Sequence, residues 1–590
     1  MDVLRPVDWV IIAAYLLFAL VVGVALARRA GRSTSEFFIS GRNLPWWLAG
    51  TSMVATSFAS DTPLVVTGWV RHGGVSENWL WWSFAVGHML TVFLLARLWR
   101  RAEVVTDVEL TELRYSGRPA AVLRAFRAAY LALPINCIAM AWVMVAMVKL
   151  LGVLFGVHPV AAVVVCVVLA TTYSVLSGFW GVVVTDLVQF VIAMAGSVGL
   201  CVLVVRSLGG VAAISEQAEA VSPLGNRLLD FFPDAGMSGA GGGQDFWSGP
   251  AFAFLMFVAV QWWANKNADG GGVMVQRMSS AKNEQHSLLA MLWFSVAHYA
   301  VRPWPWILVA VASVAVFPDL PDGEAAYPAM IKKFLPPGLM GLMLTSFLAA
   351  FMSTIDTHSN LSASYIVNDV YARFIRPKSS QRHFVWVSRA ASVGFMLVSS
   401  VIALRADSIS ALFKFMLAFS SGVGSVYILR WFWWRINAWS EISAMVVSSV
   451  IASALYVKGG LGYAPVLAIT VAGSTAIWLV VTFATAPVSR DRLVAFYRKV
   501  RPYGAWGPVA REAGVAPVLG LGRQLVNWLA GTVMVLGLTL SVGKFLLGAP
   551  WSGALYLVAA VVGFVIIRPS IAGGQPRGAR RSQPRAGMST

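Results

Sequence analysis

The chain has 590 residues, of which 58% are hydrophobic and 12% charged, and its mean hydropathy is +0.72. This composition excludes a soluble multidomain protein and predicts a polytopic membrane protein. Its 45 Lys and Arg against 26 Asp and Glu give a net charge of +19, but they are spread over many loops, which favours a membrane topology signal over nucleic-acid binding. Cys137, Cys166 and Cys201 lack the spacing of a metal site or disulfide framework.

Apolar windows of about 18 to 25 residues, each long enough to cross a hydrocarbon core of roughly 30 Å, recur about fifteen times along the chain. The first, residues 8–28, is preceded by acidic residues and followed by Arg28 and Arg29, the reverse of a cleavable signal peptide. We therefore expect it to remain, with the N-terminus outside. Lys and Arg then concentrate in alternate loops, which indicates an odd number of spans and a cytoplasmic C-terminus.

Two apolar segments are interrupted. Residues 50–68 read GTSMVATSFASDTPLVVTG, and residues 261–277 read QWWANKNADGGGVMVQR. Backbone that leaves the helix at membrane depth is tolerated only where protein or a water-filled cavity satisfies it. The interruptions fall in the first helix of two successive five-helix blocks, 46–206 and 249–431, and because five is odd the second block must run inverted. Such a pair of interruptions points to the binding site of a secondary transporter.

The predicted organisation is one membrane domain with three soluble pieces. Its parts are an N-terminal extra helix and loop (1–45), a first repeat (46–206), an acidic extracytoplasmic loop (207–248), a second repeat (249–431), further helices (432–568) that enclose a cytoplasmic amphipathic segment (486–522), and a disordered basic tail (569–590). In the amphipathic segment, Leu493, Phe496, Tyr497 and Val500 recur at helical spacing among Arg and Lys. This pattern predicts a helix lying in the membrane interface.

Motifs for nucleotide or hydrolytic chemistry are absent from the sequence. The string nearest to a phosphate-binding loop, GLTLSVGKF, has the wrong spacing, and no zinc-protease or serine-hydrolase motif occurs. We therefore expect a protein that is not an enzyme. Of the functions considered for a polytopic membrane protein, transport driven by an ion gradient is the one that remains.

Hydroxyls and an aspartate interrupt the apolar helix AAFMSTIDTHSNLSA, residues 349–363. Ser353 and Thr354, with carbonyls from the broken stretch near residues 55–58, would supply the oxygens that a sodium ion prefers. Helical hydroxyls also bond back to their own helix, but a nearby aspartate at membrane depth favours an ion site. Asp356 and Asp186 are candidates because an ionisable residue inside the membrane is costly, although Asp186 would also suit a solvated helix start.

Five strings in order resemble the signature blocks of the sodium/solute symporter family: FFISGRNLPWWLAGTSMVATSFASDTP, TDVELTELRYSG, YSVLSGFWGVVVTDLVQ, VMVQRMSSAKN and AAFMSTIDTHSNLSASYIVNDVY. The resemblance covers roughly residues 8–430. It implies the all-α leucine-transporter fold, with two inverted five-helix repeats, one N-terminal helix and about four C-terminal helices. It also implies sodium (Na+) and a small-molecule substrate as partners, a multi-pass location in the lipid bilayer of a bacterial cytoplasmic membrane, and no nucleic acid. The oligomeric state stays open.

The resemblance also implies positions for cations. The main sodium site would use the backbone carbonyls of Ala55, Phe58 and Ala350 with the hydroxyls of Ser353 and Thr354. A second site, present in some members, would place Asp186 near Ser353, Asp356 and Thr357. Because Asp356 and Thr357 stand where the family has serines, the number of coupled sodium ions, one or two, remains open.

The substrate-binding residues of the family's sugar carriers have few counterparts in this sequence. Thr62 stands in place of their glutamine, and NKNADGGG stands in place of their Asn and Tyr pattern in the sixth helix. The candidates for a polar pocket are Ser60, Asp61, Thr62, His88, Asn265, Asn267, Asp269, Arg302 and Lys414. Their charges would suit a zwitterion or a sugar acid, and the aromatic surroundings a sugar. We expect a sodium-coupled symporter that imports a small polar solute (sugar, sugar acid or amino acid) by alternating access. The alternatives are proton coupling through Asp356 and Asp186, and a solute sensor that does not transport.

Overall fold

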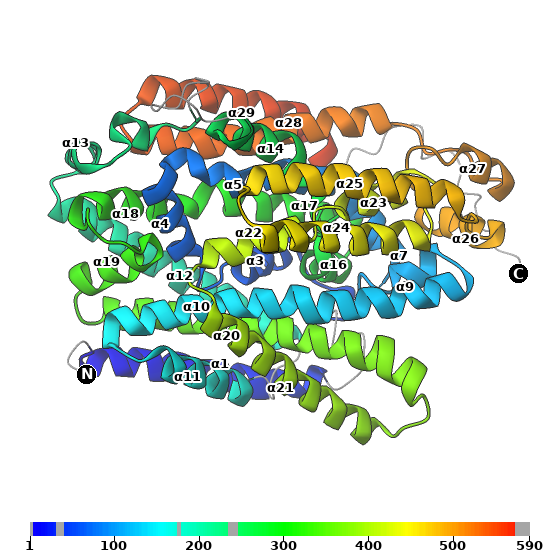
Figure 1. The fold of residues 1–590 in the computed structure, drawn as a ribbon, viewed down its shortest axis with the longest axis horizontal. Helices are drawn as coiled ribbons and strands as arrows, with labels where there is room; N and C mark the ends of the chain where they lie inside the picture. Colours follow the sequence, from blue (N-terminus) through cyan, green and yellow to red (C-terminus); the bar gives the residue numbers. More distant parts are fainter. Residues whose placement is uncertain (1–3, 31–39, 105, 174–178, 234–245, 573–590) are drawn as a thin grey trace, which may run out of the picture.

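The computed structural model describes residues 4–30, 40–104, 106–173, 179–233 and 246–572. In these ranges, helices lie along one long axis (Figure 1). We call the end where α1 (Pro6–Ala30) begins the N-terminal end, and the end that carries α26 and α27 the C-terminal end. Of the described helices, ten are long and apolar enough to cross a membrane, or eleven if α22 (Ile409–Phe419) and α23 (Gly424–Phe432), bent by 45°, form one span. The prediction of an all-helical membrane protein is confirmed.

A broken helix opens the first block of five segments. α3 (Trp46–Thr56) ends before the non-helical stretch 57–61, and α4 (Thr62–Gly73) restarts with Pro63 in its first turn, where a missing N–H leaves no helical bond unmade. The other segments are Val75–Ala102, which contains α6 (Phe84–Leu90), Gly117–Phe155, which contains α9 (Gly117–Tyr130) and α10 (Asn136–Phe155), α11 (Pro159–Tyr173) and α12 (Phe179–Ser207). The first predicted interruption is therefore present.

The second block also opens on a broken helix. α15 (Trp262–Ala264) ends the first half, and α16 (Gly271–Ser280) forms the second. Gly270 and Gly271 have φ of 121° and 70°, which residues with a side chain rarely adopt, so glycine is required here. The other segments are Glu284–Val316, which contains α17 (Glu284–Val296), η8 (Ala297–Val301) and α18 (Pro303–Val316), then Leu339–Ile375, which contains α20 (Leu339–Ser364), α21 (Gln381–Arg405), and the α22–α23 pair.

Helices outside the two blocks pack on their surface. α1 contacts α12 and α20, and its Asp8 carboxylate accepts from the Gly338 and Gly341 N–H groups at 2.7 Å each. Asp8 thus caps α20 from a neighbouring helix. The helices after the second block are α24 (Ala438–Lys458), α25 (Tyr463–Ala484), α28 (Leu521–Leu546) and α29 (Pro550–Ile571). Most of the predicted tail, and part of the predicted loop 207–248, lie outside the described residues.

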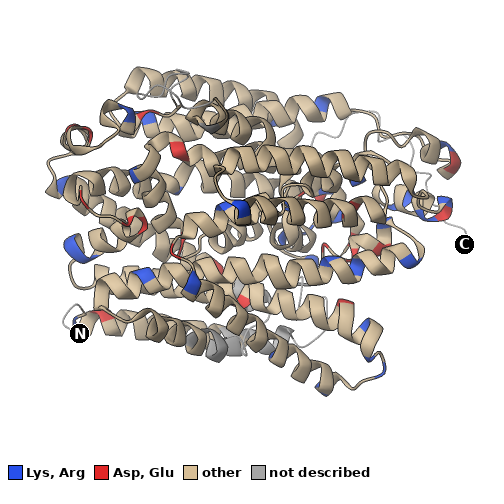
Figure 2. Ribbon diagram, viewed as in Figure 1, with Lys and Arg blue, Asp and Glu red and all other residues tan. Residues whose placement is uncertain are grey.

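The segment between α25 and α28 folds as two short helices, α26 (Arg490–Val500) and α27 (Gly507–Ala513), which carry charges of both signs (Figure 2). The sequence predicted that the apolar face of α26 lies in the membrane interface, and the structure differs. Leu493, Phe496, Tyr497 and Val500 are at most 1% exposed, because they pack against the protein, including α27 and the first block. Periodicity identifies an apolar face but not what covers it.

Candidate cation and solute site

Two of the predicted sodium ligands lie where α3 gives way to the first break. The Phe58 N–H donates to the Ala55 carbonyl at 2.9 Å, and the backbone then leaves the helix. Both residues are buried, and among the described residues no group donates to the Phe58 carbonyl. A buried carbonyl without a donor is a suitable ligand for a cation.

The other predicted sodium ligands lie on α20, which packs against α3. Ala350, Ser353 and Thr354 are buried, and the Thr354 hydroxyl donates to the Ala350 carbonyl at 2.8 Å. This is the back-bond that the sequence offered as the alternative to an ion site. It leaves the hydroxyl oxygen with lone pairs to accept or coordinate, so the bond and an ion site are compatible.

Asp186 of α12 joins these helices. Its fully buried carboxylate accepts from Ser52 at 2.6 Å, from Thr56 at 3.3 Å and from Ser353 at 3.2 Å. The Arg277 guanidinium lies 3.7 Å from the same carboxylate and donates to Thr56 at 2.9 Å. The charge on Asp186 is therefore opposed by a side chain of α16, the half-helix that follows the second break.

The two other residues proposed for a second cation site lie further along α20. Asp356 is buried and accepts from Asn360 at 2.7 Å, and Thr357 is half-buried. Their role as ligands stays a prediction. Sequence reasoning missed Arg277, although an arginine within the apolar string VMVQRM was itself a signal.

A cavity of about 320 Å³ lies between the two breaks. Thr354 is in its wall, which places the predicted cation site beside it. Six of the predicted pocket residues line this cavity: Asp61, Thr62, His88, Asn265, Asn267 and Arg302. One oxygen of Asp61 is buried without a hydrogen-bond partner among the described residues. The cavity is therefore polar where the broken helices face it.

Three other predicted pocket residues have partners elsewhere. Ser60 donates to the Val143 carbonyl at 3.3 Å, Asp269 pairs with Arg430 at 2.6 Å, and Lys414 pairs with Glu77 at 3.4 Å. None of the three lines the cavity. Ser60 and Asp269 lie within the breaks, where the backbone is not helical, so the sequence pattern does not show which way their side chains point.

Sequence reasoning missed several polar residues in the cavity wall. They are Asn136, Lys266, His298, Tyr299 and His358. Lys266 was visible as a lysine within the second break, whereas the others lie on long apolar helices. Asn136 and His358 bond to each other at 3.0 Å, and Tyr299 bonds to His88 at 2.8 Å.

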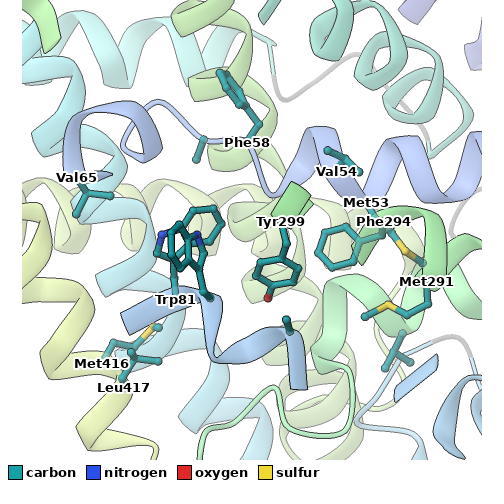
Figure 3. Packing of buried hydrophobic residues seen from close by; sticks show 14 of the residues in the cluster. Met53, Val54, Phe58, Val65, Trp81, Met291, Phe294, Tyr299, Met416 and Leu417 are labelled. Carbon is teal, nitrogen blue, oxygen red and sulfur yellow. The ribbon is translucent and has the colours of Figure 1, made fainter. Parts of the chain in front are cut away.

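Apolar and aromatic side chains form the rest of the wall. Figure 3 shows Trp81 and Tyr299 beside one another, with ring centroids 5.8 Å apart. Val65, Phe294, Met416 and Leu417 also line the cavity. A small number of polar groups on a largely apolar wall is typical of a small-molecule site.

Arg302, between η8 and α18, reaches the first break. Its guanidinium donates to the Val54 carbonyl at 3.1 Å and to the Ser57 carbonyl at 3.0 Å, while Nε is buried without a partner among the described residues. These carbonyls are next to those of Ala55 and Phe58 in the chain. A side chain of the second block therefore holds the backbone that carries two predicted sodium ligands.

Residues 37–448 match the model of the sodium:solute symporter family. The chain belongs to this family. It is 23% identical over 491 residues to a sodium/glucose cotransporter of Vibrio parahaemolyticus, covering 77% of this chain and 85% of that relative. A sodium/mannose cotransporter of Bos taurus is 24% identical over 490 residues, or 76% of this chain and 79% of the relative.

A solved structure of a Na+-coupled sialic acid symporter resembles this fold. The TM-score is 0.62 with 19% sequence identity, covering 82% of this chain and 99% of that one. This likeness confirms the leucine-transporter type of fold, and the family match confirms the resemblance seen in the sequence. Members of this family are transporters and not enzymes.

In this family member, buried charges close the cavity towards the C-terminal end. Asp107 pairs with Arg127 at 2.6 Å, and both line the cavity. Behind them, Arg430 bridges Asp269 at 2.6 Å and Glu441 at 3.1 Å. We call these five residues the charge cluster. Since all are at most 5% exposed, separating them would leave uncompensated charge in a poorly solvated place.

The α26–α27 unit packs on the end of α23, the helix that carries Arg430 of the charge cluster. Trp506 donates from its indole to the Trp431 carbonyl at 2.8 Å, and the Ala505 N–H donates to the Phe432 carbonyl at 2.7 Å. Arg114 stacks on Trp506, with 4.8 Å between guanidinium carbon and ring centroid. The unit is thus attached directly to the end of α23.

The N-terminal end of the cavity is closed by aromatic rings and one carboxylate. Trp69 and Trp142 line the cavity, and each ring lies 5.8 Å from that of Phe413. Above them, Glu324 accepts from the first N–H groups of α22, including Ile409 at 2.9 Å, and from Lys149 at 2.8 Å. Opening this end would require these contacts to part.

Proposed function

We propose that the chain is a sodium-coupled symporter that imports a small polar organic solute by alternating access. The observation that carries the proposal is the wall shared by the solute cavity and the predicted cation site. Thr354 lines the cavity, and its helix faces the break that holds the Ala55 and Phe58 carbonyls. Sodium bound by these groups would fix α3 against α20 and so preorganise the cavity for solute.

The charges near Asp186 support coupling to one sodium ion. Arg277 already opposes the carboxylate, so a second cation there would have to displace or share it. For an uncharged solute, a potential of about 100 mV contributes roughly 2.3 kcal/mol per sodium ion. A tenfold sodium gradient adds about 1.4 kcal/mol. Together these would support accumulation of roughly 500-fold, enough for nutrient uptake with a single ion.

Transport in this scheme alternates between the two ends. The aromatic rings at the N-terminal end part to admit sodium and solute, and the charge cluster parts to release them at the C-terminal end. The distribution of Lys and Arg supports a location in a bacterial cytoplasmic membrane with the N-terminal end outside. The curated relatives transport sugars by name, which supports a polar organic solute.

Uptake into proteoliposomes tests the coupling. We expect solute accumulation with an inward sodium gradient and its loss when choline replaces external sodium at fixed pH. Undiminished uptake in choline would contradict sodium coupling, and an imposed proton gradient would then test the proton alternative. Solute binding without accumulation under any gradient would instead support a sensor.

A further inference from the structure

Lys266 stands in the second break and lines the solute cavity. Its ammonium donates to the Asn267 side-chain oxygen at 3.1 Å and forms no ion pair with any described residue. A charge inside a membrane protein that lacks a counter-charge is costly, and such a residue commonly faces a ligand path. The question is which negative group compensates it.

The other cations in the cavity wall have partners. The two oxygens of Asp107 are engaged by Arg127 at 2.6 Å and by the Tyr365 hydroxyl at 2.8 Å. Arg302 forms no close ion pair with any described residue, but its guanidinium donates to the Val54 and Ser57 carbonyls. Lys266 is therefore the cation of the wall with neither an ion pair nor a backbone carbonyl acceptor among the described residues.

Geometry singles out Lys266 among the charged residues that line the cavity. These are three cations and two carboxylates: Arg127, Lys266, Arg302, Asp61 and Asp107. Arg127 pairs with Asp107 and also lies 3.7 Å from Glu441 behind the wall, so its charge is compensated. Sodium bound beside Thr354 would add a further positive charge to the cavity. A solute with a carboxylate would oppose both that ion and Lys266, whereas a neutral solute would oppose neither.

We propose that the transported solute is a small organic acid, and that Lys266 binds its carboxylate. That this acid is transported rests on the proposed function, but its binding to Lys266 does not depend on sodium coupling. Asn267, which accepts from Lys266, and His358 also line the cavity and would form hydrogen bonds with hydroxyls on the same solute. A monovalent acid carried with one sodium ion moves no net charge, so the sodium gradient alone would drive it.

Binding of matched solutes to the purified full-length protein in sodium tests the inference. The probes are pairs that differ by a carboxylate, glucuronate against glucose and gluconate against sorbitol, with glycine as a zwitterion. We expect the acids to raise the unfolding temperature and the neutral partners to leave it unchanged. Stabilisation by a neutral partner equal to that of its acid would overturn the inference.

Variants connect the preference to Lys266. Lys266→Gln should weaken acid binding about tenfold or more, the usual effect of losing a charge-assisted hydrogen bond, while Lys266→Arg retains most of it. Lys414→Gln is the matched control, because this lysine pairs with Glu77 outside the cavity and should leave acid affinity unchanged. Unaltered acid affinity in a folded Lys266→Gln protein would also overturn the inference.

Repeating the titrations in choline separates the two proposals. Acid binding that persists equally in choline would contradict sodium coupling and leave the inference intact. Sodium-dependent binding that selects neutral solutes would support coupling and reject the role of Lys266. The two failures therefore give different results in one experiment.

Discussion

Arg302 donates a hydrogen bond to the Ser57 carbonyl at 3.0 Å, so a side chain of the second block holds the break in the first. Ser57 and Val54, the second carbonyl that Arg302 binds, alternate along the chain with the predicted sodium ligands Ala55 and Phe58. The backbone that carries these predicted ligands is therefore held by a residue 245 positions further along the chain.

Arg302→Gln should raise the sodium concentration that half-saturates uptake, because the break loses its charged donors. An effect of about tenfold corresponds to one charge-assisted hydrogen bond. Arg71→Gln provides the control, since Arg71 also donates to backbone carbonyls, at Ser313 and Phe317, but lies outside the cavity wall. Equal sodium dependence in wild type and Arg302→Gln would contradict this role.

Ser353→Ala and Thr354→Ala should each raise the sodium requirement of uptake by about tenfold, because each removes one predicted oxygen ligand. Sodium titrations of initial uptake rates measure the effect. The control is Thr345→Ala on the same helix, whose hydroxyl makes an equivalent back-bond to the Gly341 carbonyl at 2.8 Å away from the site. If all three variants behave alike, the hydroxyls only support the helix.

Arg430→Met should destabilise the protein strongly, since it leaves Asp269 and Glu441 buried without their shared cation. Breaking a buried ion pair typically costs about 3–5 kcal/mol. The melting temperature in detergent measures the loss. Arg490→Met, which removes a half-exposed arginine 4.0 Å from Glu512, should change it little. A small effect at Arg430 would mean that water reaches the charge cluster.

Trp506→Ala should loosen the α26–α27 unit, because it removes a buried ring, its bond to Trp431 and the surface on which Arg114 stacks. Replacing a buried aromatic residue by alanine costs about 3–5 kcal/mol. Limited proteolysis between residues 486 and 522 should become faster. Trp551→Ala, at a position 88% exposed, should leave both proteolysis and melting unchanged. Protection of the segment in Trp506→Ala would show that other contacts hold it.

Much of the fold could be predicted from the sequence because the membrane imposes strong local rules. Apolar length identifies spans, and Pro63 and the glycines near Gly270 mark where helices break. These rules are local, which explains the error at α26: the sequence shows that the helix has an apolar face but not which part of the protein packs against that face. This locality also explains Asp269 and Ser60, polar residues within the breaks whose side chains contact partners outside the cavity.

By itself, the sequence determined the helical membrane class, the family resemblance and both breaks, because each is written in a contiguous string, and it predicted Ser353 and Thr354 as sodium ligands. Only the tertiary structure decided which charges meet. Arg277 lies against Asp186, Arg302 holds the first break, and Lys266 forms no ion pair with any residue that the structure describes. Electrostatic compensation depends on distances between segments that are far apart in the chain, and no local pattern contains them.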